Sequence, residues 1–145
     1  MQKSFTLVEI LVVTTIIGFL AVAGIVSYTQ FLKQSRDARR KADVELIRSA
    51  LEMYKSSNDL YPTSPVSPPG LPFGAALVDA SGNTYMSKIP TDPKQSELYY
   101  YFSDGNTYTF GVHLESGSFT VCSPIPSCHS TDAYCNYCMG PYGQL

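Results

Sequence analysis

An uninterrupted apolar run near the start of the chain restricts the folds open to it more than any other feature. The run extends from Phe5 to Val26, and Glu9 is its one charged residue. As an α-helix rising ~1.5 Å per residue, these 22 residues are long enough to cross a hydrocarbon layer of ~30 Å. We therefore expect a membrane-spanning helix.

Glu9 needs a physical explanation in such a helix. An acidic residue at the centre of a membrane helix is unfavourable by about 3 kcal/mol, and by less near the end. One interpretation is that Glu9, one turn into the helix, reaches interfacial water. The other is that it pairs with a cation, although no Lys or Arg occurs between Lys3 and Lys33. The partner would then be the α-amine of a cleaved chain, its own or a neighbour's.

The residues around Glu9 resemble a known processing signal. Lys3-Ser4-Phe5-Thr6-Leu7-Val8-Glu9, followed by the apolar run, is similar to the class III signal of type IV pilins and of type II secretion pseudopilins. The resemblance implies cleavage between Ser4 and Phe5, N-methylation of Phe5 and an assembly role for the Glu9 carboxylate. Before the cut the family usually has Gly, whereas this chain has Ser4.

The resemblance also implies partners and a location. The expected partners are a prepilin peptidase/methyltransferase, the inner-membrane assembly machinery, other copies of the chain or related pilins, and the lipid bilayer before assembly. No cofactor is implied. The chain would be a single-pass protein of the cytoplasmic membrane with its head outside the cytoplasm, and afterwards part of an extracellular or periplasmic filament.

A conventional secretory signal peptide is the alternative for the N-terminus. Ala21-Val22-Ala23 has the form of an A-x-A cleavage site. However, Glu9 lies where the apolar core of a signal peptide should begin, and the helical pattern continues past Val26 without a break. These two observations favour a retained helix.

The length and composition allow one small domain after the membrane segment. The chain has 145 residues and a net charge of −2, which gives no whole-chain signature of nucleic-acid binding. We divide it into a leader (1–4), the transmembrane or assembly half of a long helix (5–32) and a head (33–145). Within the head we expect an amphipathic helix (33–58), a Pro-rich loop region (59–97), an antiparallel sheet (98–122) and a Cys-rich tail (123–145).

The helix is predicted to continue into the head as one element. No Pro or Gly occurs from Ser27 to Asn58, and an apolar face recurs at spacings of three and four residues: Val44, Ile47, Leu51 and Tyr54. Asn58, Asp59 and then Pro62 mark the end of the helix. Beyond it lies a Pro-rich loop, and we expect a short helical turn between Ala75 and Lys88.

A meander of three strands follows, at 98–103, 107–114 and 118–122. In the middle strand, apolar residues alternate with Thr, Gly and His: Tyr108, Phe110, Val112 and Leu114. Their face should pack on the apolar face of the helix, because each alone would leave a stripe exposed. The predicted fold class is α+β, a pilin-like head on a long N-terminal helix.

A basic cluster follows the membrane run: Lys33, Arg36, Arg39, Arg40 and Lys41. Counted by the positive-inside rule, it would place this side of the membrane in the cytoplasm. We instead place it outside, because a class III signal has the opposite orientation. We interpret the cluster as a solvated helix face with pairs four residues apart, such as Arg39 with Asp43 and Lys41 with Glu45.

The tail contains all four cysteines: Cys122, Cys128, Cys135 and Cys138. Zinc binding is one interpretation, but the Cys-x2-Cys pair that is typical of zinc sites occurs once. We favour two disulfides, since they suit a small exported domain whose C-terminal segment has few apolar residues to hold it in place. The spacing selects none of the three connectivities.

The sequence shows no catalytic constellation. The two histidines, His113 on a strand and His129 beside Cys128, have no nucleophile or phosphate-loop motif around them. Around Ile89-Pro90-Thr91-Asp92-Pro93 the chain resembles the major pseudopilins, which bind calcium through a C-terminal loop, but we assign no metal ligands.

These observations predict a structural protein and no enzyme. The main hypothesis is a subunit of a type IV pilus or pilus-like filament, assembled by packing of N-terminal helices. The alternative is a type II secretion pseudopilin. A third hypothesis, of another class, is a membrane-anchored extracellular binding module that does not polymerise and uses the Tyr-rich sheet or the Cys tail.

Overall fold

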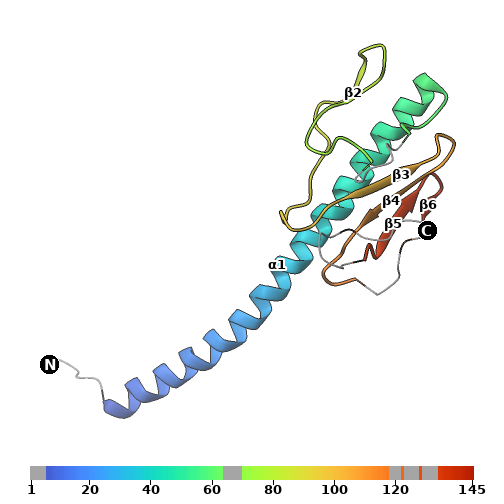
Figure 1. Cartoon of the computed structure of the whole chain (residues 1–145). Coiled ribbons are helices and arrows are strands. Elements are labelled where there is room, and N and C mark those ends of the chain that lie inside the picture. Colours follow the sequence, from blue (N-terminus) through green and yellow to red (C-terminus); the bar gives the residue numbers. More distant parts are fainter. Residues whose placement is uncertain (1–5, 64–69, 118–121, 123–127, 129–133) are drawn as a thin grey trace. The chain divides into compact units, whose positions relative to one another are not determined.

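The computed structural model describes residues 6–63, 70–117, 122, 128 and 134–145. One helix, α1 (Leu7–Asn58), is followed by six short strands (Figure 1). They are β1 (Leu77–Val78), β2 (Thr84–Met86), β3 (Tyr100–Ser103), β4 (Tyr108–Val112), β5 (Tyr137–Gly140) and β6 (Gly143–Gln144). The chain divides after Ser35 into two compact units, which are described separately.

The first unit is the N-terminal part of α1. By length and composition α1 is able to cross a membrane. Apolar side chains such as Leu7, Phe19 and Val22 are 81%, 78% and 67% exposed. This unit has no core of its own among the described residues, and an exposed apolar surface of this size marks an interaction site.

α1 ends where the sequence predicts. Asp59 has a φ of 62°, in the left-handed region, and its N–H donates to the Lys55 carbonyl at 2.8 Å. The Asn58 side-chain amide donates to the Tyr54 carbonyl at 3.0 Å. These bonds satisfy carbonyls that a helix end leaves without partners.

The head contains one four-stranded antiparallel sheet in the order β3-β4-β5-β6. Tyr101 pairs with Phe110, which pairs in turn with Met139. The predicted segments 98–103 and 107–114 are thus confirmed as strands. Residues 118–121 of the third predicted strand lie outside the described residues, and the strand that pairs with the far edge of β4 is β5, from the tail.

The predicted core is confirmed. Val44, Ile47 and Leu51 are at most 2% exposed, and they belong to one cluster with the inward side chains of β4, namely Tyr108, Phe110 and Val112. The helix face and the sheet face therefore bury each other. Figure 1 shows the strands beside this part of α1.

The expected helical turn between Ala75 and Lys88 is wrong. This segment forms a two-stranded antiparallel hairpin of β1 and β2. The Asp79 carboxylate accepts hydrogen bonds from the backbone N–H groups of Ser81 and Asn83 at 2.8 and 2.9 Å, and Gly82 has a φ of 86°. An Asp that binds the backbone ahead of it favours a turn over a helix.

Candidate functional site

The apolar surface of the first unit is the first functional feature. The four consecutive residues 10–13 make a full turn, and each is about half exposed: Ile10 52%, Leu11 56%, Val12 47% and Val13 48%. The apolar surface therefore encircles the helix instead of forming a stripe. A helix that is apolar all round is suited to lipid or to the interior of a helix assembly. Both environments remove the same surface from water.

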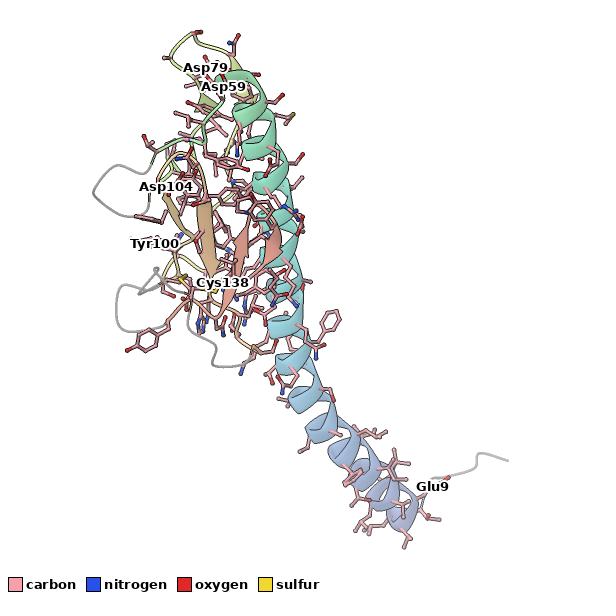
Figure 2. All side chains as sticks on the ribbon, turned by 90° about the vertical axis from the view of Figure 1, so that its right-hand side faces the viewer. Glu9, Asp59, Asp79, Tyr100, Asp104 and Cys138 are labelled. Atoms are coloured by element: carbon pink, nitrogen blue, oxygen red, sulfur yellow. A yellow bond between two sulfur atoms is a disulfide. The ribbon has the colours of Figure 1, made fainter. Side chains whose placement is uncertain are left out.

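Glu9 lies in the first turn of this helix, where its side chain is exposed (Figure 2). Its backbone N–H donates to the Thr6 hydroxyl at 3.2 Å, so Thr6 caps the helix. The pattern Thr6-x-x-Glu9 is that of a capping box, and a carboxylate in the first turn is favoured by the helix dipole. This capping-box pattern is visible in the sequence, and it adds a third role for Glu9 beside contact with interfacial water and pairing with an amine. Ser4 and Phe5 lie outside the described residues, so the cleavage site and the pairing of Glu9 stay predictions.

The head contains a buried ionic cluster near the start of its helical part. We call it the Arg40 cluster, and it consists of Arg36, Asp37, Arg40, Asp92, Lys94 and Glu115. The Arg40 side chain is 0% exposed and contacts three carboxylates, those of Asp92, Asp37 and Glu115, at 2.7, 2.9 and 3.1 Å. The cluster therefore joins α1 to the loop before β3 and to the turn after β4.

The electrostatics of the cluster lower the pKa of two of its carboxylates, Glu115 and Asp37. A two-bond contact with Arg36, at 2.6 and 2.7 Å, is the main cause that lowers the pKa of Glu115 to about 2. Burial would raise the pKa of Asp37, but hydrogen bonds from the Ser116 hydroxyl and from the N–H groups of Glu115 and Ser116 lower it below its ordinary value. Charged hydrogen bonds of this kind compensate the cost of burying the ions.

The interpretation of the basic residues as a solvated face is therefore wrong for Arg36 and Arg40. Asp43 likewise faces inward, where its carboxylate accepts the Tyr99 hydroxyl at 2.7 Å. Arg39 and Lys41 are exposed as expected. The sequence held a usable signal, because Arg36 and Arg40 precede Val44 at spacings of four and so extend the buried face of the helix.

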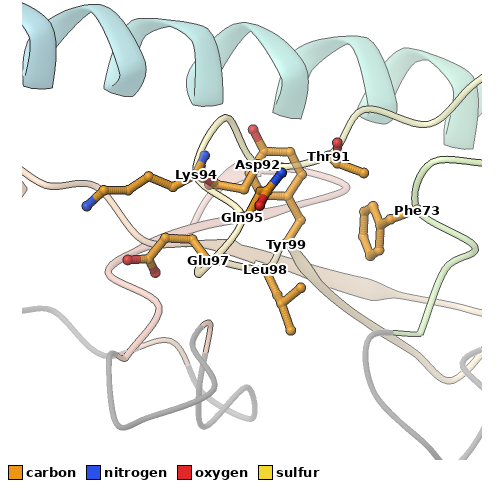
Figure 3. A pocket seen from close by; sticks show the side chains of 8 residues that line it. All are labelled: Phe73, Thr91, Asp92, Lys94, Gln95, Glu97, Leu98 and Tyr99. Carbon is orange, nitrogen blue, oxygen red and sulfur yellow. Dashed lines mark hydrogen bonds between the residues drawn. The ribbon is translucent and has the colours of Figure 1, made fainter.

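A small cavity of about 210 Å³ lies next to this cluster (Figure 3). It is lined by Phe73, Thr91, Asp92, Lys94, Gln95, Glu97, Leu98 and Tyr99. Asp92 and Lys94 are already engaged by Arg40 and Glu115. The lining residues thus mainly hold the loop before β3 in place.

The four cysteines form two disulfides, Cys122 with Cys138 and Cys128 with Cys135. This pairing overturns the zinc interpretation, because zinc needs thiolates. The half-buried Tyr100 packs against the disulfides and lies near Cys138 (Figure 2). The Leu98 N–H donates to the Cys128 carbonyl at 2.9 Å. The tail is thereby fixed to the face of the sheet that is turned away from α1.

His113 is partly exposed, with its Nδ1 3.0 Å from the Tyr134 carbonyl oxygen. Within the described ranges, no three His, Cys, Asp or Glu side chains are grouped so that they could hold a metal ion. His129 lies outside those ranges, as do some of the residues around it.

Comparisons with known proteins agree with the geometry. A family model described as the prokaryotic N-terminal methylation motif matches residues 1–25. The type II secretion system core protein G of Escherichia coli (strain K12) is 32% identical over 131 residues, covering 86% of this chain and 82% of the relative. The protein of the same name from Pseudomonas aeruginosa (strain PAO1) is 31% identical over 121 residues, covering 77% and 81%. No solved structure matches the chain significantly.

Proposed function

The chain belongs to the family of type II secretion system core protein G, and we propose that it is a subunit of the pilus-like filament of a type II secretion system. Such a protein is structural and has no enzymatic activity. The main hypothesis from the sequence, a type IV pilus, has less support than its alternative, the pseudopilin, because the relatives are named for type II secretion. The coarser prediction of a pilin-like filament subunit is supported by both comparisons.

The observation that carries this proposal is the contrast between the two units. The head buries its apolar side chains against one another, whereas the first unit exposes Leu7, Phe19 and others almost completely. Transfer of that helix from lipid to a bundle of like helices exchanges one apolar environment for another. The same segment therefore serves as the membrane anchor before assembly and as the assembly surface afterwards.

The location follows from the same features. We place the helix in the cytoplasmic membrane and the head in the periplasm. Family membership, the methylation motif and the two disulfides support this orientation, since disulfides persist in oxidising compartments. A prepilin peptidase that cuts before Phe5 and methylates it is the proposed processing partner.

A binding module that presents its aromatic sheet receives less support. Three tyrosines of the sheet region point into the core, where Tyr99, Tyr101 and Tyr108 are at most 3% exposed, whereas the strongly exposed Tyr134 and Tyr142 lie outside the strands. Four of the aromatic contacts within the head involve one of the three buried side chains, and the Tyr99 hydroxyl donates to the Asp43 carboxylate. Their role is therefore packing.

Glu9 provides the sharpest test. In an assembled filament we propose that its carboxylate pairs with the terminal amine of a neighbouring Phe5. Glu9→Ala would leave that amine unpaired in an apolar bundle, a cost on the order of 3 kcal/mol, or more than a hundredfold in the tendency to assemble. Glu9→Gln should behave similarly because it carries no charge.

The experiment compares protein in the membrane fraction with protein in sheared filaments, checked by electron microscopy. Both Glu9 variants should insert normally and yield few or no filaments. Thr6→Ala is the matched control, because it removes the helix cap and keeps the carboxylate. If Glu9→Ala assembles as well as wild type, Glu9 is a capping or interfacial residue.

A further inference from the structure

The exposed face of α1 within the head carries regularly spaced residues that do not belong to the buried core. We call it the outer stripe, and its residues are spaced alternately by three and four: Arg39, Ala42, Leu46, Ser49 and Met53. All five are exposed, with Leu46 at 57% and Met53 at 50%, whereas Val44, Ile47 and Leu51 on the opposite face are at most 2% exposed. This spacing is that of the a and d positions of a coiled-coil seam.

The surface beside the stripe is hollowed. A shallow groove of about 510 Å³ is lined by Glu45, Arg48, Ser49, Glu52, Met53 and Ser56. Ser49 and Ser56 are small, so another helix can come close at these positions. Glu45 and Glu52 occupy the flanking position immediately before Leu46 and Met53, where a coiled coil places the charges that select its partner.

A second copy of the chain is the occupant that this surface fits. The stripe lies on the same continuous helix as the apolar segment that, in the proposed function, packs against other copies. Chains anchored in one membrane present these helices to one another in parallel. A neighbouring copy therefore brings its own outer stripe with it.

The charges select a register for that contact. Without an offset, Arg39 of one copy would face Arg39 of the other, and like charges repel. A shift of one heptad, about 10 Å at ~1.5 Å per residue, places Arg39 beside Glu45. The same shift sets Leu46 against Met53 and Ala42 against Ser49, so apolar meets apolar and small meets small.

We propose that the outer stripe is a second assembly surface, which binds the outer stripe of another copy displaced by one heptad along the helix. This inference rests on the proposed filament and adds to it a contact between heads. It assigns Arg39 and Glu45 as the pair that fixes the register.

Engineered cysteines measure the register directly. The four native cysteines are all paired in disulfides, so any new intermolecular disulfide should join introduced cysteines. With a one-heptad offset, Ala42→Cys and Ser49→Cys in one chain should form a ladder of disulfide-linked multimers in filaments. Each single variant should form little dimer, because like positions would be about 10 Å apart, beyond the ~7 Å limit between bridged Cα atoms. The matched control is Ser81→Cys with Lys88→Cys, also exposed and seven residues apart, and it should give no ladder.

The possible outcomes separate this inference from the proposed function. Filaments without a ladder, or with dimers of the single variants instead, would overturn the offset contact and leave the filament role intact. Wild type that forms no filaments would overturn the proposed function and this contact with it.

A charge exchange provides an independent readout on the same surface. Arg39→Glu should lower the filament yield, and adding Glu45→Arg should restore it. Both residues are exposed, and within the monomer Glu45 forms an exposed ion pair with Arg48 at 3.5 Å. Arg39→Glu keeps that pair and the double variant loses it, and because exposed pairs contribute less than about 1 kcal/mol, the thermal stability of the monomer should change little. If Arg39→Glu reduces the yield and the double variant does not recover it, the pair does not set the register.

Discussion

The Arg40 guanidinium holds the Asp92 carboxylate through two hydrogen bonds, Nε to Oδ2 at 2.7 Å and Nη2 to Oδ1 at 3.0 Å. The two residues are 52 positions apart in the sequence. The Arg40 side chain is 0% exposed and that of Asp92 is 1% exposed, so the pair is inaccessible to water. This bidentate contact fixes the loop before β3 onto α1, and three predictions concern the head that it helps to hold together.

Removing Arg40 should destabilise the head strongly. Arg40→Ala leaves the buried carboxylates of Asp37 and Asp92 without the guanidinium that both contact, which should lower the free energy of unfolding by about 3 to 5 kcal/mol. Arg39→Ala, one residue earlier on the exposed side, should change it by less than about 0.5 kcal/mol. Denaturant unfolding of the full chain in detergent, followed by near-UV circular dichroism of its 11 Tyr, measures both. Equal losses in the two variants would show that Arg40 is not a buried anchor.

Acid should destabilise the head through two carboxylates whose pKa an ion pair or hydrogen bonds lower, those of Glu115 and Asp79. The pKa of Glu115 is about 2, mainly because of Arg36, and hydrogen bonds chiefly from Asn83 lower the pKa of Asp79 to about 2. A carboxylate with a lowered folded-state pKa contributes stability above its ordinary pKa of about 4, and this contribution disappears as the pH falls through about 2. Unfolding between pH 6 and 2 should therefore show a falling free energy, with a smaller fall in Glu115→Gln. A pH profile that this substitution leaves unchanged would exclude Glu115 as a contributor.

The two disulfides should contribute unequally. Cys122 and Cys138 are 16 positions apart, whereas Cys128 and Cys135 are 7 apart. From loop closure, replacing the first pair by Ser should cost about 3 kcal/mol and replacing the second about 2 kcal/mol. Unfolding of the two double-serine variants gives the order, and peptide mapping of non-reduced protein gives the connectivity. Finding Cys122 joined to Cys128, for example, would contradict the structure.

The mature chain should begin at Phe5 with a methylated amine. Leader removal eliminates Met1 to Ser4, and the intact mass of the purified subunit reports both cleavage and methylation. The methylation-motif match over residues 1–25 supports this expectation. A retained Met1, or a chain that begins after Ala23, would refute it.

The long helix and its buried face were predictable because their signals are local. Periodic apolar residues, the absence of Pro and Gly and the Asn58-Asp59 end all lie within a few turns of one another. The alternating strand β4 is similarly self-contained. Such patterns report directly on which face of an element is buried.

The partners of Arg40 and the far half of the sheet were not predictable in this way. Arg40 contacts Glu115 across 75 positions, and β5 pairs with β4 although its sequence, Tyr-Cys-Met-Gly, shows no clear alternation. The register Gly111 with Cys138 places the Cys122–Cys138 disulfide over a glycine. These relationships depend on tertiary contacts, which spacing along the chain does not encode.

The late position of β5 and β6 in the sequence also determines when the sheet of the head can form. β5 and β6 complete it, and Cys138 closes a disulfide with Cys122, so the sheet that packs on the helix face around Leu51 is incomplete until residues 137–144 have been synthesised. At roughly 5 to 20 residues per second, synthesis of the head takes several seconds after the apolar segment has been made. With the proposed membrane location, the anchor is available to the membrane well before the head can fold, and we expect insertion to precede folding.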